Sequence, residues 1–173
     1  LVARECGQNL VPVKLELGGK GAAVIFDDVD IPEAADKLAQ AITSHTGQVC
    51  CTATRWLVQK TIYDDFVNAA VDRLKAVQIG HPLGEGTQMG PVVSEVQHKR
   101  VLGYLEKGTA AGAETVLEGG AAQVEGCAGG HYVKPALLAG SLDNVAAREE
   151  IFGPVAYLAS FNDESEGIRL ANN

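Results

Sequence analysis

The segment Gly47-Gln-Val-Cys-Cys-Thr-Ala-Thr-Arg55 places two cysteines, Cys50 and Cys51, next to each other. A disulfide between direct neighbours is strained, because a relaxed bridge needs Cα atoms roughly 5.5 Å apart and converging Cβ atoms. Zinc binding is also disfavoured, since zinc ligands usually come in closely spaced pairs and the other cysteines and the histidines form none. Two interpretations remain: small buried side chains at the end of an element, or thiolates that attack electrophilic carbon.

A carboxylate, Glu16, follows an alternating segment and precedes Leu17 and two glycines. Glycines allow a backbone and a ligand to approach closely, so a carboxylate at this point is a candidate acid or base. The more ordinary interpretation is a solvated strand residue. Lys14 lies on the same face of the expected strand, and an ion pair with it accounts for Glu16 without any chemistry.

The composition restricts the class of protein. With 173 residues, 46% of them hydrophobic and 21% charged, the chain is long enough to bury one core, and disorder is excluded. A formal net charge of −8 disfavours binding to nucleic acid or to an anionic membrane surface. Apolar stretches fall far short of the ~20 residues that a spanning helix needs, and no signal peptide is recognised at the start. We therefore expect a cytoplasmic protein with no nucleic-acid or membrane partner.

Strands and helices alternate along the chain. Val13, Leu15 and Leu17 alternate with charged residues, which is typical of a half-buried strand. Helix starts are marked by Asp30 and by the capping box Ser94-Glu-Val-Gln97. The alternation predicts an α/β fold with a largely parallel sheet flanked by helices. Strands are expected over residues 12–17, 22–26, 56–58, 115–117, 132–133 and 155–161, and helices from 31 toward 45 and over 61–77, 95–111 and 163–173.

The order and spacing of several motifs resemble the aldehyde dehydrogenase superfamily. The motifs are Leu15-Glu-Leu-Gly-Gly-Lys20, Gly47-Gln-Val-Cys50 followed by Arg55, Gly90-Pro-Val-Val-Ser94 and Glu149-Glu-Ile-Phe-Gly-Pro-Val155. The resemblance covers essentially the whole chain. It implies that residues 1–17 end a Rossmann-like cofactor-binding domain with its last strand. Residues 18–173 are then the catalytic domain, truncated at its C-terminal end.

The resemblance also implies a role for each site residue. Cys50 is the nucleophile that forms a thiohemiacetal with the aldehyde and then a thioester, and Cys51 is its variable neighbour. Glu16 is the general base that activates the water for thioester hydrolysis. Glu150 binds the ribose on the nicotinamide side of NAD or NADP, Phe152 packs against the nicotinamide end, and Leu17 is placed on the cofactor side.

Ordinary structural interpretations exist for several of these positions. Glu150 could form an ion pair with Arg148, and Phe152 could belong to the core. We expect Lys20 to be structural. His45 stands where the family commonly has another residue type, and it either lines the substrate tunnel or caps a helix end, with the cap favoured.

The resemblance predicts that the intact protein oxidises an aldehyde to a carboxylic acid with NAD or NADP and forms a homodimer or homotetramer. Retention of Glu16 favours hydrolysis of the thioester over transfer to coenzyme A. No Gly-x-Gly-x-x-Gly fingerprint occurs here, so the 173-residue segment alone is expected to be inactive. Two alternatives stay open: a thiol esterase without a redox step, and a non-enzymatic binding or structural relative on the same fold.

Overall fold

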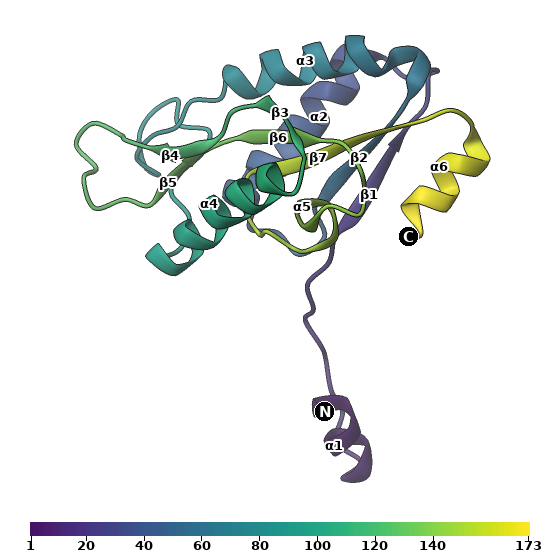
Figure 1. The fold of residues 1–173 in the computed structure, drawn as a ribbon. Coiled ribbons are helices and arrows are strands. Elements are labelled where there is room, and N and C mark those ends of the chain that lie inside the picture. The colour runs from purple at the N-terminus through teal and green to yellow at the C-terminus, as the bar shows by residue number, and fades with distance from the viewer.

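The computed structural model describes residues 1–173 as a three-layer α/β body with an extended N-terminal arm (Figure 1). The central sheet has the strand order β1-β2-β7-β6-β3. Neighbours β1, β2, β7 and β6 run parallel, and only β3 at one edge is antiparallel. The predicted largely parallel sheet is confirmed. The strands are β1 (Gly21–Ile25), β2 (Ala53–Gln59), β3 (Glu114–Leu117), β6 (Ala136–Ala139) and β7 (Val155–Phe161).

Helices cover both faces of this sheet because alternate strand residues point to opposite sides. On β2, Trp56 and Val58 pack against α2 and α3, whereas Leu57 lies on the opposite face, where α6 packs. On that second face, α4 and α5 pack over β6 and β7. The helices are α2 (Ile31–Thr43), α3 (Tyr63–Lys75), α4 (Glu95–Ala110), α5 (Val145–Arg148) and α6 (Glu164–Ala171).

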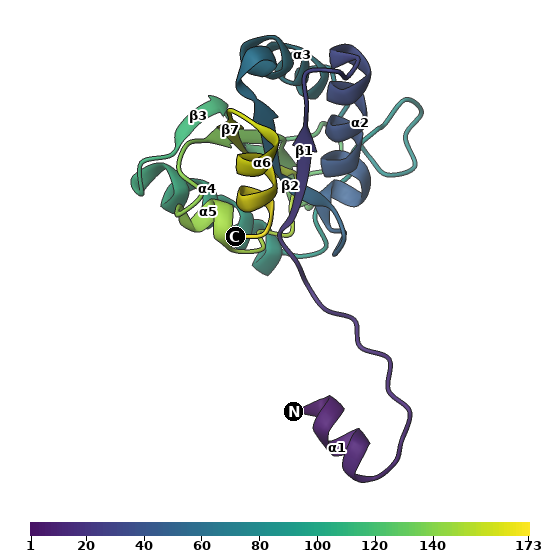
Figure 2. The same ribbon diagram turned by 90° about the vertical axis from the view of Figure 1, so that its right-hand side faces the viewer.

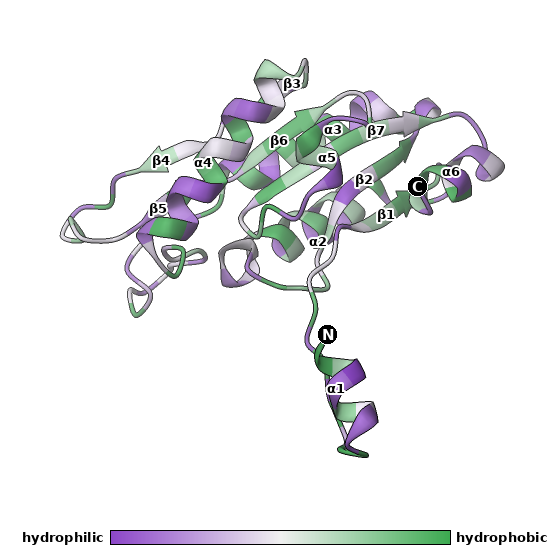
Figure 3. Cartoon of the chain, turned by 60° about the horizontal axis from the view of Figure 1, so that its bottom comes forward, coloured by the Kyte–Doolittle hydropathy of each residue, from purple (hydrophilic) through white to green (hydrophobic).

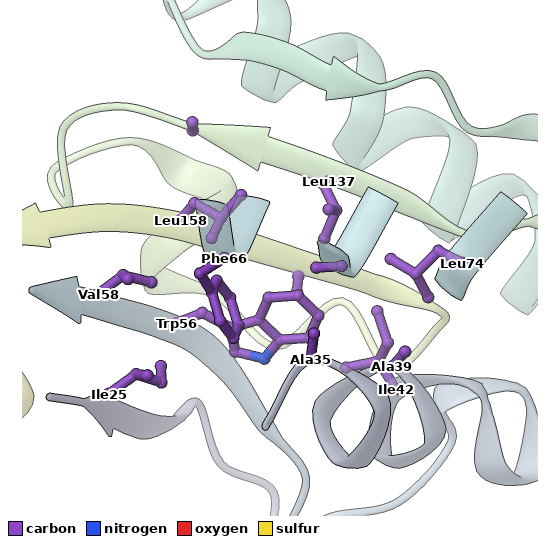
Figure 4. Packing of buried hydrophobic residues seen from close by; sticks show 13 residues of the cluster. Ile25, Ala35, Ala39, Ile42, Trp56, Val58, Phe66, Leu74, Leu137 and Leu158 are labelled. Atoms are coloured by element: carbon purple, nitrogen blue, oxygen red, sulfur yellow. The ribbon is translucent and has the colours of Figure 1, made fainter. Parts of the chain in front are cut away.

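The larger core cluster joins α2 and α3 to the sheet (Figure 4). Trp56 and Phe66 meet edge to face with ring centroids 6.0 Å apart, and both are fully buried. Burying each such side chain contributes about 2–3 kcal/mol, so this face of the sheet is a main source of stability. The hydropathy colouring shows the same distribution, with hydrophobic residues concentrated in the central strands and polar residues on the outer helix surfaces (Figure 3).

The predicted helix starts are confirmed by their caps. Asp30 accepts a hydrogen bond from the backbone N–H of Glu33 at 2.9 Å, and Ser94 accepts one from Gln97 at 3.2 Å. Asp163 caps α6 in the same way. Each cap satisfies one of the N–H groups that a helix leaves without an internal partner. None of the helices combines the length and apolar character needed to cross a bilayer.

The strand predicted over residues 12–17 is wrong. This segment is extended but pairs with no other strand, and Val13, Leu15 and Leu17 are all exposed. Alternation alone does not make a strand, because the backbone groups need a neighbouring strand to complete the ladder. The arm leads instead to α1 (Val2–Gln8), an unpredicted helix without buried residues that lies away from the body in both views (Figures 1 and 2).

Other short elements were also missed by the sequence patterns. Strand β4 (Gly120–Ala122) was not predicted, and it pairs antiparallel with β5 (Tyr132–Lys134) in a separate two-stranded sheet. Strand β5 covers the strand expected over residues 132–133. The four residues of β6 are all buried and show no alternation, and α5 has only four residues. Such short apolar runs carry too little periodicity to distinguish a strand from a helix.

Candidate active site

Three motifs meet at the amino-terminal edge of the sheet. Strands β1, β2 and β7 are parallel, so the segments that lead into them end on the same side. Residues 16–20 precede β1, residues 48–50 precede β2, and residues 150–152 precede β7. They border an open pocket of about 840 Å³. Its lining consists of Glu16, Leu17, Gly18, His45, Gln48, Val49, Cys50, Gln97, Arg100, Glu150 and Phe152.

All five residues predicted for the site line this pocket: Cys50, Glu16, Leu17, Glu150 and Phe152. Proximity shows that they share one site, and it assigns no role to any of them. A larger groove of about 1130 Å³ lies between α4 and β3. Its lining holds no cysteine or histidine and none of the motif residues. The groove is therefore not the candidate active site, although it is larger than the pocket.

The turn that presents Cys50 has an unusual backbone. After α2, His45, Thr46 and Gly47 have φ angles of 48°, 58° and 71°. A Cβ atom on Gly47 would lie 2.2 Å from the carbonyl carbon of Gly153, so only glycine fits here. Thr46 Oγ1 donates a hydrogen bond to the carbonyl of Gly90 at 3.1 Å. The turn is thereby held against two neighbouring loops.

Gln48 braces the same turn from the pocket side. Its Nε2 donates to the carbonyl of His45 at 3.0 Å, and its Oε1 accepts the N–H of Val93 at 2.9 Å. Both Cys50 and Cys51 are exposed free thiols. The interpretation of these cysteines as small buried residues is therefore wrong, and Cys50 is available to a ligand in the pocket.

Glu150 is held by backbone contacts rather than by the ion pair considered from the sequence. Its Oε1 accepts the N–H of Gly19 at 3.1 Å, and a Cβ on Gly18 would lie 2.2 Å from Oε2. Arg100 Nη2 donates to the Glu150 carbonyl at 2.6 Å. Arg148 pairs with Asp143 instead, at 3.3 Å. Gly18 thus leaves the space that the carboxylate occupies, and Gly19 supplies the N–H that binds it, next to the motif that carries Glu16.

Phe152 is half-buried, lines the pocket, and has a φ of 61°. A bulky side chain in this left-handed region is an outlier that persists only when its surroundings hold it. Gln97 provides that support, because its Nε2 donates to the carbonyls of Ile151 and Phe152 at 3.0 and 2.7 Å. Such a conformation is typical of functional sites. Phe152 belongs to none of the buried core clusters.

Glu16 and Leu17 lie on the exposed arm at the mouth of the pocket. The pairing with Lys14 considered from the sequence does occur, with Nζ 3.4 Å from Glu16 Oε1. Both side chains are largely exposed, so the pair contributes little to stability and leaves the carboxylate accessible from the pocket. The ion pair and a role in the pocket are therefore compatible.

Six of the eleven lining residues were not predicted as site residues, and three of them come from outside the predicted motifs or from the turn before Gly47. His45 was expected to cap a helix end, but Ser44 is the C-cap of α2 and His45 lies in the pocket wall. Gln97 was identified only through its capping box, and Arg100 was not singled out. The spacing of Gln97 and Arg100 places both on one face of α4, which is the only signal that the sequence contained.

Lys20 lies behind this pocket, in a small cavity whose lining it shares with Glu150 and Thr54. Burial, followed by the positive charge of Arg55, lowers the pKa of the Lys20 ammonium to about 8, against the opposing effect of the Glu150 carboxylate. The charged form of Lys20 is therefore less favourable in the folded chain than in the unfolded chain, where the ammonium is in water.

Replacing Lys20 with methionine is expected to stabilise the fold at neutral pH. Between pH 8 and 10.5 the unfolded chain binds more protons at this position, so stability rises with pH across that window and is lower below it. The shift corresponds to at most about 3 kcal/mol. Urea unfolding across this pH range should show a rise that Lys20→Met removes. The exposed Lys60→Met is the matched control, and an equal pH dependence in wild type and Lys20→Met would contradict the assignment.

Comparison with known proteins identifies the family of the chain. A family model described as the aldehyde dehydrogenase family matches residues 1–173. The chain belongs to the aldehyde dehydrogenase family. Among curated relatives of the chain, a betaine aldehyde dehydrogenase of Brucella anthropi is 40% identical over 173 residues. An aldehyde dehydrogenase of Deinococcus radiodurans is 42% identical over 178 residues. These alignments cover 99% and 100% of this chain but only 36% and 35% of the relatives.

Solved aldehyde dehydrogenase structures have the same fold. HpcC from Thermus thermophilus matches with a TM-score of 0.90 and 38% identity. Betaine aldehyde dehydrogenase from Staphylococcus aureus, in complex with NAD+, matches with a TM-score of 0.90 and 34% identity. Both matches cover 99% of this chain and 34% of the other. The chain thus spans about a third of the length of its relatives.

No group of three or more His, Cys, Asp or Glu side chains in the chain is placed to hold a metal ion.

Proposed function

We propose that the intact protein oxidises an aldehyde to a carboxylic acid with NAD or NADP. The observation that carries this proposal is the convergence of Cys50, Glu16, Glu150 and Phe152 on one pocket of an aldehyde dehydrogenase fold. Two of the relatives are betaine aldehyde dehydrogenases, which suggests a small polar aldehyde as the first substrate to test. Because this chain spans only about a third of those proteins, the activity belongs to the whole protein.

Cys50 is the proposed nucleophile. It is exposed at the end of a braced turn, where its sulfur can reach the carbonyl carbon of an aldehyde in the pocket. Attack by the Cys50 thiolate forms a C–S bond as the carbonyl π bond breaks. The oxyanion takes up a proton from solvent to give a thiohemiacetal on Cys50, and it returns this proton to solvent when the carbon is oxidised. The nicotinamide cofactor, when bound, supplies the oxidising capacity by accepting a hydride from that carbon. The Cys50 thioester that remains must then be hydrolysed to release the acid.

Glu16 is the proposed general base for this hydrolysis. Its carboxylate lines the same pocket as Cys50 and is exposed to solvent, so it can take a proton from a water molecule there. The activated water attacks the thioester carbon, the C–S bond breaks, and the Cys50 thiolate leaves. The proton stays on Glu16 until it passes to solvent, which the exposed position of Glu16 allows.

The residues predicted for the cofactor fit its nicotinamide end. Glu150 accepts one hydrogen bond on Oε1, from Gly19, so Oε2 remains able to accept a bond from a ribose hydroxyl. The Phe152 ring stands in the pocket wall, where a flat nicotinamide ring can pack against it. Leu17 adds an exposed apolar side chain to the same lining. We assign these three residues to cofactor binding.

We further propose that residues 1–17 belong to a cofactor-binding unit and residues 18–173 to the catalytic unit. The arm and α1 are largely exposed, with Leu1 and Leu10 more than 90% accessible. Apolar residues exposed in this number indicate a surface that the remaining parts of the protein cover. Assembly as a homodimer or homotetramer and a cytoplasmic location stay predictions.

The full-length protein and the 173-residue chain should be compared in one assay. We expect the full-length protein to form NADH or NADPH with betaine aldehyde or related small aldehydes. The short chain should be inactive, because the remainder of the cofactor site lies outside it. The rate of ester hydrolysis without a nucleotide is measured in parallel. Ester hydrolysis without any aldehyde oxidation by the full-length protein would contradict the proposal and favour the thiol esterase. The absence of both activities would favour a non-enzymatic relative.

A further inference from the structure

Arg55 on β2 is a buried cation without an acidic partner. It is 9% exposed, and no carboxylate forms an ion pair with it. Its guanidinium is satisfied by backbone carbonyls from two segments that are far apart in the sequence. Nε donates to the carbonyl of Lys20 at 2.9 Å, Nη2 donates to that of Ala171 at 2.9 Å, and Nη1 donates to that of Leu170 at 3.2 Å.

The bond to Lys20 lies at an irregularity in the sheet. Gly21 of β1 aligns with Ala53 of β2, but the next residue, Ala22, aligns with Arg55, so Thr54 is skipped. A bulge of this kind interrupts the backbone ladder and redirects the chain. The Lys20 carbonyl stands at the interruption and receives its hydrogen bond from the Arg55 side chain. The arm that carries Glu16 leaves the sheet at this point.

The remaining bonds are made at the C-terminal end of α6, which packs against β1 and β2 (Figure 2). Helix C-termini carry carbonyls without internal partners and a partial negative charge, so a guanidinium there is favourable. Arg55 therefore connects three elements: the arm before β1, the strand β2 that follows Cys50, and the end of α6. A buried charge held in this way has little freedom to move.

We propose that Arg55 is a positioning residue that holds the Glu16 arm in register with Cys50. It touches neither of the reacting groups and acts through the Lys20 carbonyl, which fixes where the arm departs from the sheet. The proposal rests on the function proposed for Glu16 and Cys50. Lysine cannot substitute, because one ammonium lacks the planar fork that spans the arm and the helix end together.

A double-mutant cycle in the full-length enzyme tests this role. Arg55→Lys, Glu16→Gln and the double variant are compared by kcat and by KM for the aldehyde and the cofactor. Arg55→Lys should lower kcat by about ten- to a hundredfold, as misplacement of a catalytic group does, with both KM values nearly unchanged. In the Glu16→Gln background, Arg55→Lys should cause no further loss. Arg169→Lys, at an exposed arginine on α6, is the matched control and should match wild type.

The outcomes distinguish a failure of the general-base role of Glu16 from a failure of the positioning role of Arg55. If Glu16→Gln alone leaves kcat unchanged, the function proposed for Glu16 fails, whatever Arg55 does. If Glu16→Gln lowers kcat but the effects of the two substitutions multiply, Arg55 does not act through Glu16 and the positioning role is overturned. An unchanged kcat in Arg55→Lys overturns it as well. Should Arg55→Lys fail to fold, Arg55→Gln provides the same cycle, because it keeps donors without leaving an unpaired buried charge.

Discussion

Replacing Cys50 with alanine is expected to abolish aldehyde oxidation by the full-length protein, with a loss of about 10⁴-fold or more in kcat. The reason is that no other group can form the covalent bond to the aldehyde carbon. Cys50 alone among the four cysteines lines the pocket with Glu16 and Glu150. Removing the nucleophile therefore removes every later step, and the remaining rate measures what binding alone can do.

The neighbouring thiol supplies a matched control. Cys51 is as free and exposed as Cys50 but is absent from the pocket lining, so Cys51→Ala should retain most of the activity. Initial rates of NAD(P)H formation are measured for both variants, together with cofactor binding, which Cys50→Ala should preserve. Activity that survives Cys50→Ala and is lost in Cys51→Ala would reverse the assignment of the nucleophile.

Replacing Glu16 with glutamine is expected to lower steady-state turnover by about 10²- to 10⁴-fold, the usual contribution of a general base. The amide keeps the size of the side chain but cannot take a proton from water. Formation of the Cys50 thioester does not require hydrolysis, so the first turnover should still occur. The variant should therefore release a burst of about one NAD(P)H per site and then stall with the cysteine acylated.

Rapid-mixing kinetics and intact-mass measurement of the acylated enzyme test this directly. Lys14→Met is the control, since it removes the ion partner of Glu16 while leaving the carboxylate in place. We expect a near wild-type rate for it, because exposed ion pairs contribute little. If the burst itself is lost in Glu16→Gln, the carboxylate acts before the thioester forms. If neither phase changes, Glu16 is a solvated arm residue.

The sequence by itself determined the local features of this protein. These features depend on residues only a few positions apart, so they can be recognised from the order of residues alone. They are the alternation of strand residues, the caps at Asp30 and Ser94, and the motifs around Cys50 and Glu150. These features were sufficient for the α/β class and for the family. They also predicted five of the eleven residues that line the pocket. That prediction came from the family resemblance, because a sequence alone does not show which residues touch.

Only the tertiary structure decided how these pieces meet. The approach of Gly18 to Glu150 and the bonds of Arg55 to α6 join segments more than a hundred residues apart. The left-handed backbone of Phe152 is held by Gln97, which is itself 55 residues away. The register of β1 on β2 and the packing of α6 determine such contacts, and neither leaves a periodic signal. For the same reason the alternating residues 12–17 were read as a strand. A strand exists only with a partner, and the sheet in this chain provides none.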